Sequence, residues 1–334
     1  MSIPRITVVG GYATGLTLKV KRLPCTGETI LASGYRVHYG GKGSNQAVGC
    51  VRLGAEVAFV AKIGEDAFGE MALRLYREEG IDVAFVHQTA ERPTGMCFIL
   101  VEAETGNNCV VVDPGANELL SPFDVVQCEA ALKTSAVLLT QLEIPVAAAV
   151  AALFRARENG ATTILNPSPV RPLPPSVLQL VDVLTPNQTA AKVITGRSPD
   201  AGVEPEEVAR DLIRAGVRQV VMTLGEKGAL IVTASSAIHV AAMTMSAVDT
   251  TGAGDAFNAG LATALASGES LESAVEFAVV TGGLAVTREG VIPSLPRREE
   301  VVQFYQQRSL RPPSWLVASG KAERPYDQGE VPGH

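Results

Sequence analysis

The sequence lacks the long apolar run of about 18 consecutive residues that a membrane-spanning helix requires. Its most apolar region, residues 130–154, is interrupted by polar residues and by Pro145. The first residues enter a strand pattern directly, at residues 6–10, so we expect no signal peptide. We also expect no membrane partner.

Positive charge is in short supply, since 28 Lys and Arg residues face 35 Asp and Glu residues, giving a net charge of −7 at pH 7. Nucleic-acid-binding domains are typically basic, so we do not expect a nucleic-acid partner. An acidic chain can still hold an anionic substrate, because one site can be locally basic.

Cysteine is scarce and scattered. The five cysteines lie within the first 128 residues, and they form neither a C-x-x-C pair nor a metal-binding spacing. Reduced structural thiols in a cytoplasmic protein are the simplest interpretation of this pattern, and a redox function is a weaker alternative.

What the sequence does contain is a repeated alternation of short apolar strands and helices. With 334 residues, of which 46% are hydrophobic, the chain can bury the core of one or two domains. From about residue 130 onward the predicted strands cover residues 136–139, 162–165, 181–184 and 220–223, and the predicted helices cover residues 146–159, 206–215, 256–266 and 271–286. This alternation predicts a parallel sheet covered on both faces, with ligands at the carboxyl ends of its strands.

The first 120 residues follow a different pattern, with strands that lie outside this alternation. The predicted strands cover residues 16–21, 28–32, 35–39, 95–102 and 109–113. We interpret them as a small β-sheet lid on the α/β body, formed by about residues 12–42 and 94–113. An exposed sheet face of this kind favours a homodimer, because a partner lid would cover it.

The end of the chain, residues 309–334, loses all periodicity and contains four prolines. This composition predicts a flexible tail after a body formed by residues 1–308. Trp315, the only tryptophan, is the candidate for docking the tail onto the body.

The most informative motif is residues 249–255, Asp-Thr-Thr-Gly-Ala-Gly-Asp, directly before an apolar helical stretch. A helix N-terminus presents unpaired N–H groups and a partial positive charge, and therefore binds anions. Gly252 and Gly254 would let a phosphate approach the backbone, and Asp255 would lie beside it, placed to accept a proton from an attacking hydroxyl. A glycine-rich turn with a capping aspartate is also a common structural device, so this motif alone leaves both interpretations open.

A second glycine-rich motif, residues 40–46 with the sequence Gly-Gly-Lys-Gly-Ser-Asn-Gln, precedes another helical stretch. Its ammonium and amide groups suit hydroxyls or phosphate, although a glycine-rich turn with a solvated lysine is the ordinary alternative. Two such helix starts, far apart in the chain, are more informative than either alone.

These two motifs, with shorter ones around them, resemble the ribokinase-like (pfkB) family of carbohydrate kinases over roughly residues 5–305. The other matching segments are Leu23-Pro24 with Gly27-Glu28-Thr29, Gly64-x-Asp66-x-x-Gly69, Pro114-Gly115-Ala116-Asn117, Gln141-Leu142-Glu143, Thr185-Pro186-Asn187, Thr223-Leu224-Gly225-x-x-Gly228, Thr287-Arg288-x-Gly290 and Pro293-Ser294. The resemblance implies a three-layer α/β/α body with a largely parallel sheet and a small β-sheet lid. It also implies ATP as phosphate donor, with Mg²⁺ as cofactor.

The resemblance further implies roles for individual residues. Asp255 corresponds to the catalytic base, and the N–H groups of Gly252, Ala253 and Gly254 correspond to an anion hole for the transferring phosphoryl group. The positions that would bind the sugar are Gly41, Lys42, Asn45, Glu143 and Asp255. The positions that would bind ATP are Asn187, Thr223, Gly225, Gly228 and Gly254. The positions of a monovalent-cation site, expected to hold K⁺ as activator, are Asp249, Thr251, Ala285, Arg288, Gly290 and Ser294.

Two motif carboxylates of the family are missing. Family members carry Asn-x-Asp after the first strand, and the aspartate binds two sugar hydroxyls, but here Ala13 and Gly15 occupy these positions. Loss of such a partner weakens discrimination and leaves the acceptor open between ribose and a bulkier or anionic compound. The family's Asn-x-x-Glu motif ends here in Ala190, which we expect to weaken the placement of Mg²⁺.

Retention of Asp255 and the complete glycine run favours an active kinase for a sugar or sugar-like small molecule. A nucleoside kinase of the same family is one alternative. A ligand-binding or regulatory relative with weak catalysis is the other.

Overall fold

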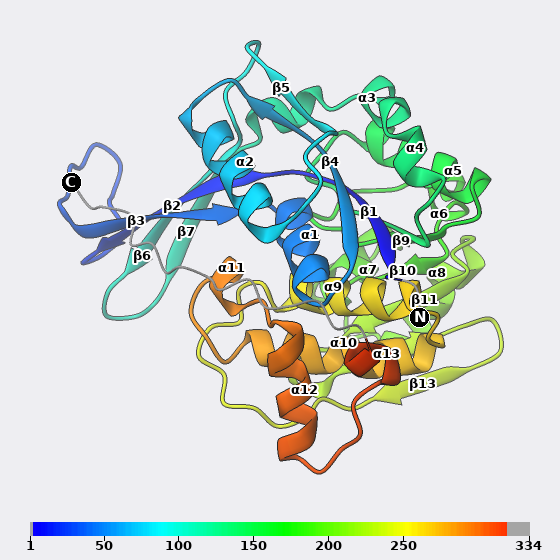
Figure 1. Ribbon diagram of the computed structural model, residues 1–334. Helices are drawn as coiled ribbons and strands as arrows, with labels where there is room; N and C mark the ends of the chain where they lie inside the picture. The colour runs from blue at the N-terminus through cyan, green and yellow to red at the C-terminus, as the bar shows by residue number, and fades with distance from the viewer. Residues whose placement is uncertain (1–2, 319–334) are drawn as a thin grey trace.

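The structure is a computed structural model, and it describes residues 3–318. Within these residues, none of the helices is both long enough and apolar enough to cross a membrane. Two sheets organise the chain: a large one in the body and a small one that projects to one side (Figure 1).

The large sheet has nine strands within residues 3–318, and most of them are parallel. In spatial order they are β13 (Ala237–Val240), β12 (Ala229–Val232), β11 (Gln219–Thr223), β10 (Val183–Leu184), β9 (Thr162–Leu165), β8 (Val137–Thr140), β1 (Arg5–Val9), β4 (Glu56–Gly64) and β5 (Val86–Thr89). Pairing from β5 to β11 is parallel, whereas β12 and β13 are antiparallel additions at one edge. The central strands are buried on both faces, as their continuous apolar sequences predict.

Helices cover both faces of this sheet, on opposite sides in Figure 1. One face carries α1 (Lys42–Arg52), α2 (Ala67–Glu79), α9 (Ala253–Ala266), α10 (Leu271–Ala285), α11 (Val291–Ser294), α12 (Arg298–Gln307) and α13 (Ser314–Ala318). The other face carries α3 (Pro122–Gln127), α4 (Glu129–Leu132), α5 (Val146–Glu158), α6 (Pro175–Leu178), α7 (Gln188–Ile194) and α8 (Pro205–Arg214). Two separate apolar cores result, one on each side of the sheet, which confirms the predicted three-layer α/β/α body.

Helix α9 lies deep in one of these cores and is buried along most of its length. Its sequence is rich in alanine and apolar on all sides, which suits a helix enclosed by protein. It packs against α10 and also against α1, where small residues meet: a Cβ at Gly49 would lie 2.6 Å from the Cβ of Ala259. This close approach brings the start of α1 beside the start of α9.

The small sheet has four strands within the described chain, in the order β3 (Ala32–Gly40), β2 (Ala13–Val20), β6 (Met96–Glu102) and β7 (Asn108–Asp113). It confirms the predicted separate lid, and it lies beside the body in Figure 1. Apolar side chains remain exposed on it, among them Tyr35, Val111 and Val112.

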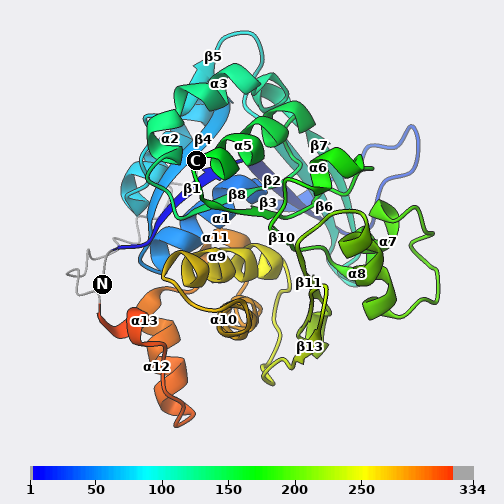
Figure 2. The same cartoon turned by 90° about the vertical axis from the view of Figure 1, so that its right-hand side faces the viewer.

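Three details differ from the sequence-based predictions. Residues 28–31 form no strand, because β3 begins only at Ala32. Strands β4 and β5 and helix α2 extend the α/β alternation into the N-terminal region, where the sequence pattern predicted none of these three elements. Part of the predicted flexible tail is a helix, α13, which lies beside α12 in Figure 2.

The prediction that Trp315 docks this segment onto the body is confirmed, because its ring is buried and lies 5.0 Å from the ring of Phe277 in an edge-to-face contact. This packing holds residues 314–318 as a helix where composition predicted a flexible segment. The rest of the predicted tail, residues 319–334, lies outside the described residues.

Candidate active site

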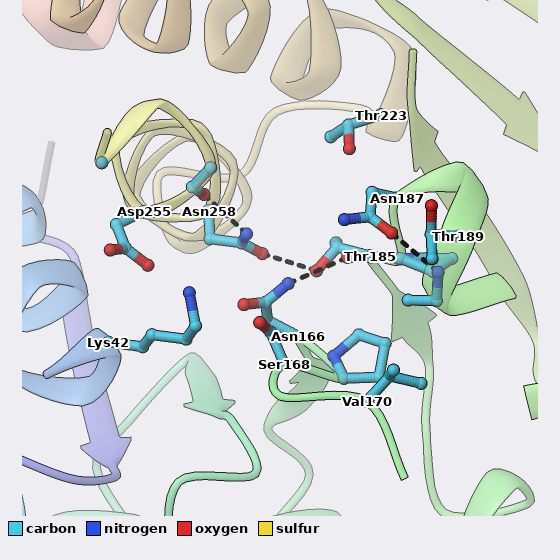
Figure 3. A pocket seen from close by; sticks show the side chains of 15 residues that line it. Lys42, Asn166, Ser168, Val170, Thr185, Asn187, Thr189, Thr223, Asp255 and Asn258 are labelled. Carbon is cyan, nitrogen blue, oxygen red and sulfur yellow. Dashed lines mark hydrogen bonds between the residues drawn. The ribbon is translucent and has the colours of Figure 1, made fainter. Parts of the chain in front are cut away.

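The site is a cleft of about 270 Å³ at the carboxyl ends of the parallel strands, next to the start of α9 (Figure 3). Parallel strands of an α/β sheet place their ligands at this edge. The cleft is lined by Lys42, Asn166, Pro167, Ser168, Val170, Thr185, Pro186, Asn187, Thr189, Ala190, Thr223, Gly252, Gly254, Asp255 and Asn258. Lys42 and Asp255 lie at one end of the cleft, and Asn187, Thr189 and Thr223 lie at the other (Figure 3).

The first turn of α9 forms part of the cleft wall. Gly252 caps the helix with φ of 85°, a conformation that glycine adopts without strain. A Cβ at Gly254 would meet open space, so its backbone is accessible from the cleft. The N–H of Ala253 was predicted to face an anion, but it already donates to the carbonyl of Thr250 at 3.3 Å. The predicted anion hole therefore has its most accessible backbone at Gly254.

Asp255 lies in this first turn and is only 5% exposed, with its side chain at the cleft wall. Both of its oxygens accept hydrogen bonds from amides at the start of α1. The Nδ2 atom of Asn45 donates to Oδ2 at 2.9 Å, and the Nε2 atom of Gln46 donates to Oδ1 at 2.9 Å. Two amide donors from one helix thus fix the orientation of the carboxylate on the other.

The amides around Asp255 retain unused acceptors. The Oε1 atom of Gln46 accepts from Gln141, which follows β8. The Oδ1 atom of Asn45 and the Oε1 atom of Gln141 are buried without a partner among the described residues. Buried polar atoms are normally satisfied, so an unpaired acceptor beside a cleft is suited to a hydroxyl of a ligand.

Glu143 lies close to the start of α1, where its Oε2 accepts from the backbone N–H of Lys42 at 2.6 Å. Burial, with a smaller contribution from the charge of Asp255, raises the pKa of the Glu143 carboxyl to about 7 against the opposing effect of Lys42. A carboxyl with this pKa changes its charge near neutral pH.

The other end of the cleft is built on Asn187 and Asn258. Asn187 caps α7, with Oδ1 accepting from the N–H of Ala190 at 2.7 Å. Asn258, one turn after Asp255 on α9, accepts from Thr185 Oγ1 at 2.6 Å and donates to the carbonyl of Gly254 at 2.8 Å. The sequence did not single out Asn258, although its position one turn beyond the glycine run was a usable signal.

Not all the predicted positions line the cleft. Gly225 is the first residue of the turn η2 (Gly225–Lys227) after β11, Gly228 follows its end, and both have positive φ. The cleft wall includes neither of them, nor Gly41, Asn45 or Glu143. Gly41, Asn45 and Glu143 instead lie around the start of α1: Gly41 caps this helix, Asn45 contacts Asp255, and Glu143 contacts the N–H of Lys42. Thr223 and Asn187 do form part of the wall.

Among the predicted cation-site residues, Asp249, Thr251 and Gly290 meet beside the start of α9. The Oδ1 atom of Asp249 accepts from the N–H of Thr251 at 2.9 Å, and its Oδ2 accepts from the N–H of Gly290 at 3.0 Å. Partial burial opposes ionisation, but these hydrogen bonds outweigh it and lower the pKa of Asp249 below its ordinary value. The side chain of Arg288 instead donates to Glu300 at 2.7 Å, and Ser294 and Ala285 are buried.

Clusters of three or more His, Cys, Asp or Glu side chains that could hold a metal ion do not occur within residues 3–318. Ala190, which replaces the motif glutamate, is 6% exposed and lies in the cleft wall. At the other departure, Gly15 lies under the imidazole ring of His38, on the neighbouring strand of the lid.

Comparison with known proteins agrees with this geometry. Residues 4–298 match the model of the pfkB family carbohydrate kinases. The chain is 36% identical over 304 residues to a ribokinase of Haemophilus influenzae, covering 90% of this chain and 98% of that protein. It is 32% identical over 300 residues to a deoxyribokinase of Salmonella typhi, again covering 90% and 98%.

A solved structure of Arabidopsis thaliana ribokinase complexed with ribose and ATP matches with a TM-score of 0.84 at 29% identity, covering 90% of this chain and 98% of that one. Both the sequence and the arrangement of the two sheets are therefore those of one family. The chain belongs to the pfkB family of carbohydrate kinases.

Proposed function

We propose that this protein transfers the terminal phosphoryl group of ATP to a hydroxyl group of a pentose, with Asp255 as the general base. One observation carries the proposal: the Asp255 carboxylate is buried in the first turn of α9, held by two amides, at the wall of a cleft beside the accessible backbone of Gly254. A positioned base and an anion-binding helix start are the two parts that phosphoryl transfer to an alcohol requires.

In this proposal the acceptor lies between Asp255 and the start of α1. Asn45 and Glu143 bind sugar hydroxyls there, because they present a buried unpaired amide oxygen and a half-buried carboxyl. Asp255 accepts the proton of the attacking hydroxyl. The backbone at Gly252 and Gly254, with the positive end of α9, stabilises the charge of the transferring group.

ATP occupies the rest of the cleft, toward Asn187 and Thr223. Asp255 is the one carboxylate among the described residues of the cleft wall, and Ala190 adds none. This donor set fits a Mg²⁺ ion that takes most of its ligands from nucleotide phosphates and water. When bound, Mg²⁺ neutralises charge on the phosphates.

A monovalent cation fits beside Asp249, whose lowered pKa keeps it negatively charged at neutral pH. K⁺ at this position, with oxygen ligands from the segments around Thr251 and Ser294, would order the loop that leads into α9. Turnover is then expected to fall when K⁺ is replaced by a large organic cation. Equal turnover with both cations would remove this part of the proposal.

The acceptor class follows from the relatives, which include a ribokinase and a deoxyribokinase. We therefore favour a pentose over a nucleoside. Residues 1–308 form the kinase domain, and the lid sheet covers the acceptor. The apolar face of the lid, with Tyr35 and Val111 exposed, is the surface through which we expect a homodimer. The five free cysteines support a cytoplasmic location.

The test is ATP turnover with D-ribose, 2-deoxy-D-ribose, sugar acids, sulfosugars and nucleosides, with the phosphorylated product detected by ³¹P NMR. The proposal predicts a sugar phosphate from at least one pentose. Turnover confined to nucleosides would assign the protein to the nucleoside kinases instead. Binding of these compounds without turnover would indicate a regulatory relative.

A further inference from the structure

In the lid, a side chain from the neighbouring strand occupies the space where the family's sugar-binding aspartate is missing. Gly15 lies in β2, directly opposite His38 of β3 on one side and Cys97 of β6 on the other. Residues directly opposite each other in a sheet share one face. His38, Gly15 and Cys97 therefore form one row across the lid.

The imidazole ring of His38 occupies the space above Gly15. A Cβ at position 15 would lie 2.0 Å from Cε1 of the ring, 2.4 Å from Nδ1 and 2.6 Å from Nε2. These separations are all shorter than any real contact, so a side chain at position 15 and the ring at its present position exclude each other. The backbone of Gly15 has no positive φ, and steric overlap alone is what requires glycine here.

This row lies at the end of the lid that adjoins the start of α1. Strand β3 ends at Gly40, two residues after His38, and α1 begins at Lys42. The N–H of Lys42 contacts Glu143, so the row is close in the chain to the residues proposed to bind the acceptor. Burial raises the pKa of the Cys97 thiol, and the negative charge of Glu143 raises it further.

The ring also has one nitrogen free. Its Nε2 lies 2.9 Å from Oγ1 of Thr17, which holds the ring in place from the same strand as Gly15. The Nδ1 atom has no hydrogen-bond partner among residues 3–318. A ring fixed by one nitrogen can therefore bind a ligand through the other.

We propose that His38 is a specificity-determining residue that replaces the family's aspartate and binds the acceptor sugar through a single hydrogen bond from its free ring nitrogen. This inference rests on the proposed function. A carboxylate can accept from two vicinal hydroxyls at once, whereas one imidazole nitrogen binds only one. The consequence is a site that discriminates weakly between ribose and sugars that lack one of the two hydroxyls.

The experiment measures kcat/KM for D-ribose, 2-deoxy-D-ribose and 3-deoxy-D-ribose in the wild type and in three variants. We expect wild-type values for ribose and for the better deoxy sugar to agree within roughly 10-fold. His38→Ala lowers kcat/KM for both by roughly 10-fold. Gly15→Asp loses turnover because of the overlap with the ring, and Gly15→Asp/His38→Ala regains turnover with a ribose preference increased by roughly 10- to 100-fold.

Arg36→Gln is the matched control, because Arg36 points from the same face of β3 but is largely exposed and pairs with Glu289. It removes positive charge from the lid without touching the row, and the sugar preference should stay unchanged. Circular dichroism and ATP affinity verify that each variant is folded. A second readout is the ¹⁵N spectrum of the imidazoles, in which the His38 signal, identified by its loss in His38→Ala, shifts when ribose is added.

Several results would overturn the inference while leaving the proposed function intact. One is sugar phosphorylation whose ribose preference is the same in the wild type, His38→Ala and the double variant. A second is full activity of Gly15→Asp alone, and a third is an imidazole ¹⁵N signal of His38 that does not shift when ribose is added. Failure of the proposed function would give a different result, because neither the wild type nor any variant would then phosphorylate a sugar.

Discussion

The side-chain amide of Gln46, in the first turns of α1, donates a 2.9 Å hydrogen bond to Oδ1 of Asp255, in the first turn of α9. The two residues are more than 200 positions apart in the chain. Their contact depends on the packing of α1 against α9, where Gly49 and Ala259 allow a close approach. It joins the two glycine-rich motifs of the sequence into one site.

Loss of this contact should impair catalysis more than binding. In Gln46→Leu one oxygen of Asp255 loses its donor, and hydrogen bonds to charged groups contribute about 1.5–3 kcal/mol. We expect kcat to fall by roughly 10-fold or more while ATP affinity is retained. Gln127→Leu, the same exchange at an exposed position of α3, is the control. A kcat equal to that of the control would show that Gln46 does not position the base.

Acceptor binding should depend on pH through Glu143. Its pKa of about 7 means that the carboxyl gains a proton as the pH falls from 8 to 6, and a protonated carboxyl loses acceptor capacity for sugar hydroxyls. We expect KM for the pentose to rise over this range, while KM for ATP stays nearly constant. In Glu143→Gln this pH dependence should disappear, and its persistence would exclude Glu143 as its source.

The same group affects stability with a defined sign. Because the pKa of Glu143 is raised in the folded state above its value of 4.5, its protonation favours folding. This contribution is fully present below the unfolded pKa and is lost as the pH rises through about 7. Urea denaturation of Glu143→Gln should therefore show the variant gaining stability relative to wild type between pH 5 and pH 8.

A buried ion pair links the C-terminal end of α1 to α2. Arg52 is 5% exposed and pairs with Glu79 of α2, which is 4% exposed, and its Nη1 also donates to the carbonyls of Ile292 and Leu295. Removing one partner of a buried ion pair typically costs about 3–5 kcal/mol of stability. Glu79→Gln removes only the negative charge and keeps a side chain that can still accept a hydrogen bond from Arg52. We expect a loss of about 2 kcal/mol in denaturant unfolding. Glu78→Gln, at the exposed neighbouring position, should change stability little.

Much of the site could be predicted because its parts are local in sequence. A helix start with Gly252, Gly254 and Asp255 has the same geometry wherever it occurs, and the strand-helix alternation predicted that it would lie at the edge of a parallel sheet. The helix in fact begins at Ala253. That places the Ala253 amide in a turn with Thr250, a bond that no sequence pattern indicated.

The parts that could not be predicted depend on register and packing. The position of His38 over Gly15 follows from the pairing of β2 with β3, and the sequence showed only that Gly15 lacked its expected carboxylate. The sequence indicated Trp315 as the docking residue, but its contact with Phe277 needs the assembled α10 surface and could not be named in advance. The strand predicted at residues 28–31 is absent, because a locally apolar sequence forms a strand only where a neighbouring strand can pair with it.

The most direct test of the account is the rate of pentose phosphorylation by Asp255→Asn, which keeps the shape of the side chain but removes the base. A general base contributes roughly 10²- to 10⁴-fold to such a reaction. We predict that kcat falls by this factor while ATP and pentose still bind and the protein stays folded. A variant that phosphorylates pentose at the wild-type rate would contradict the account, because the carboxylate at the start of α9 would then have no part in the chemistry.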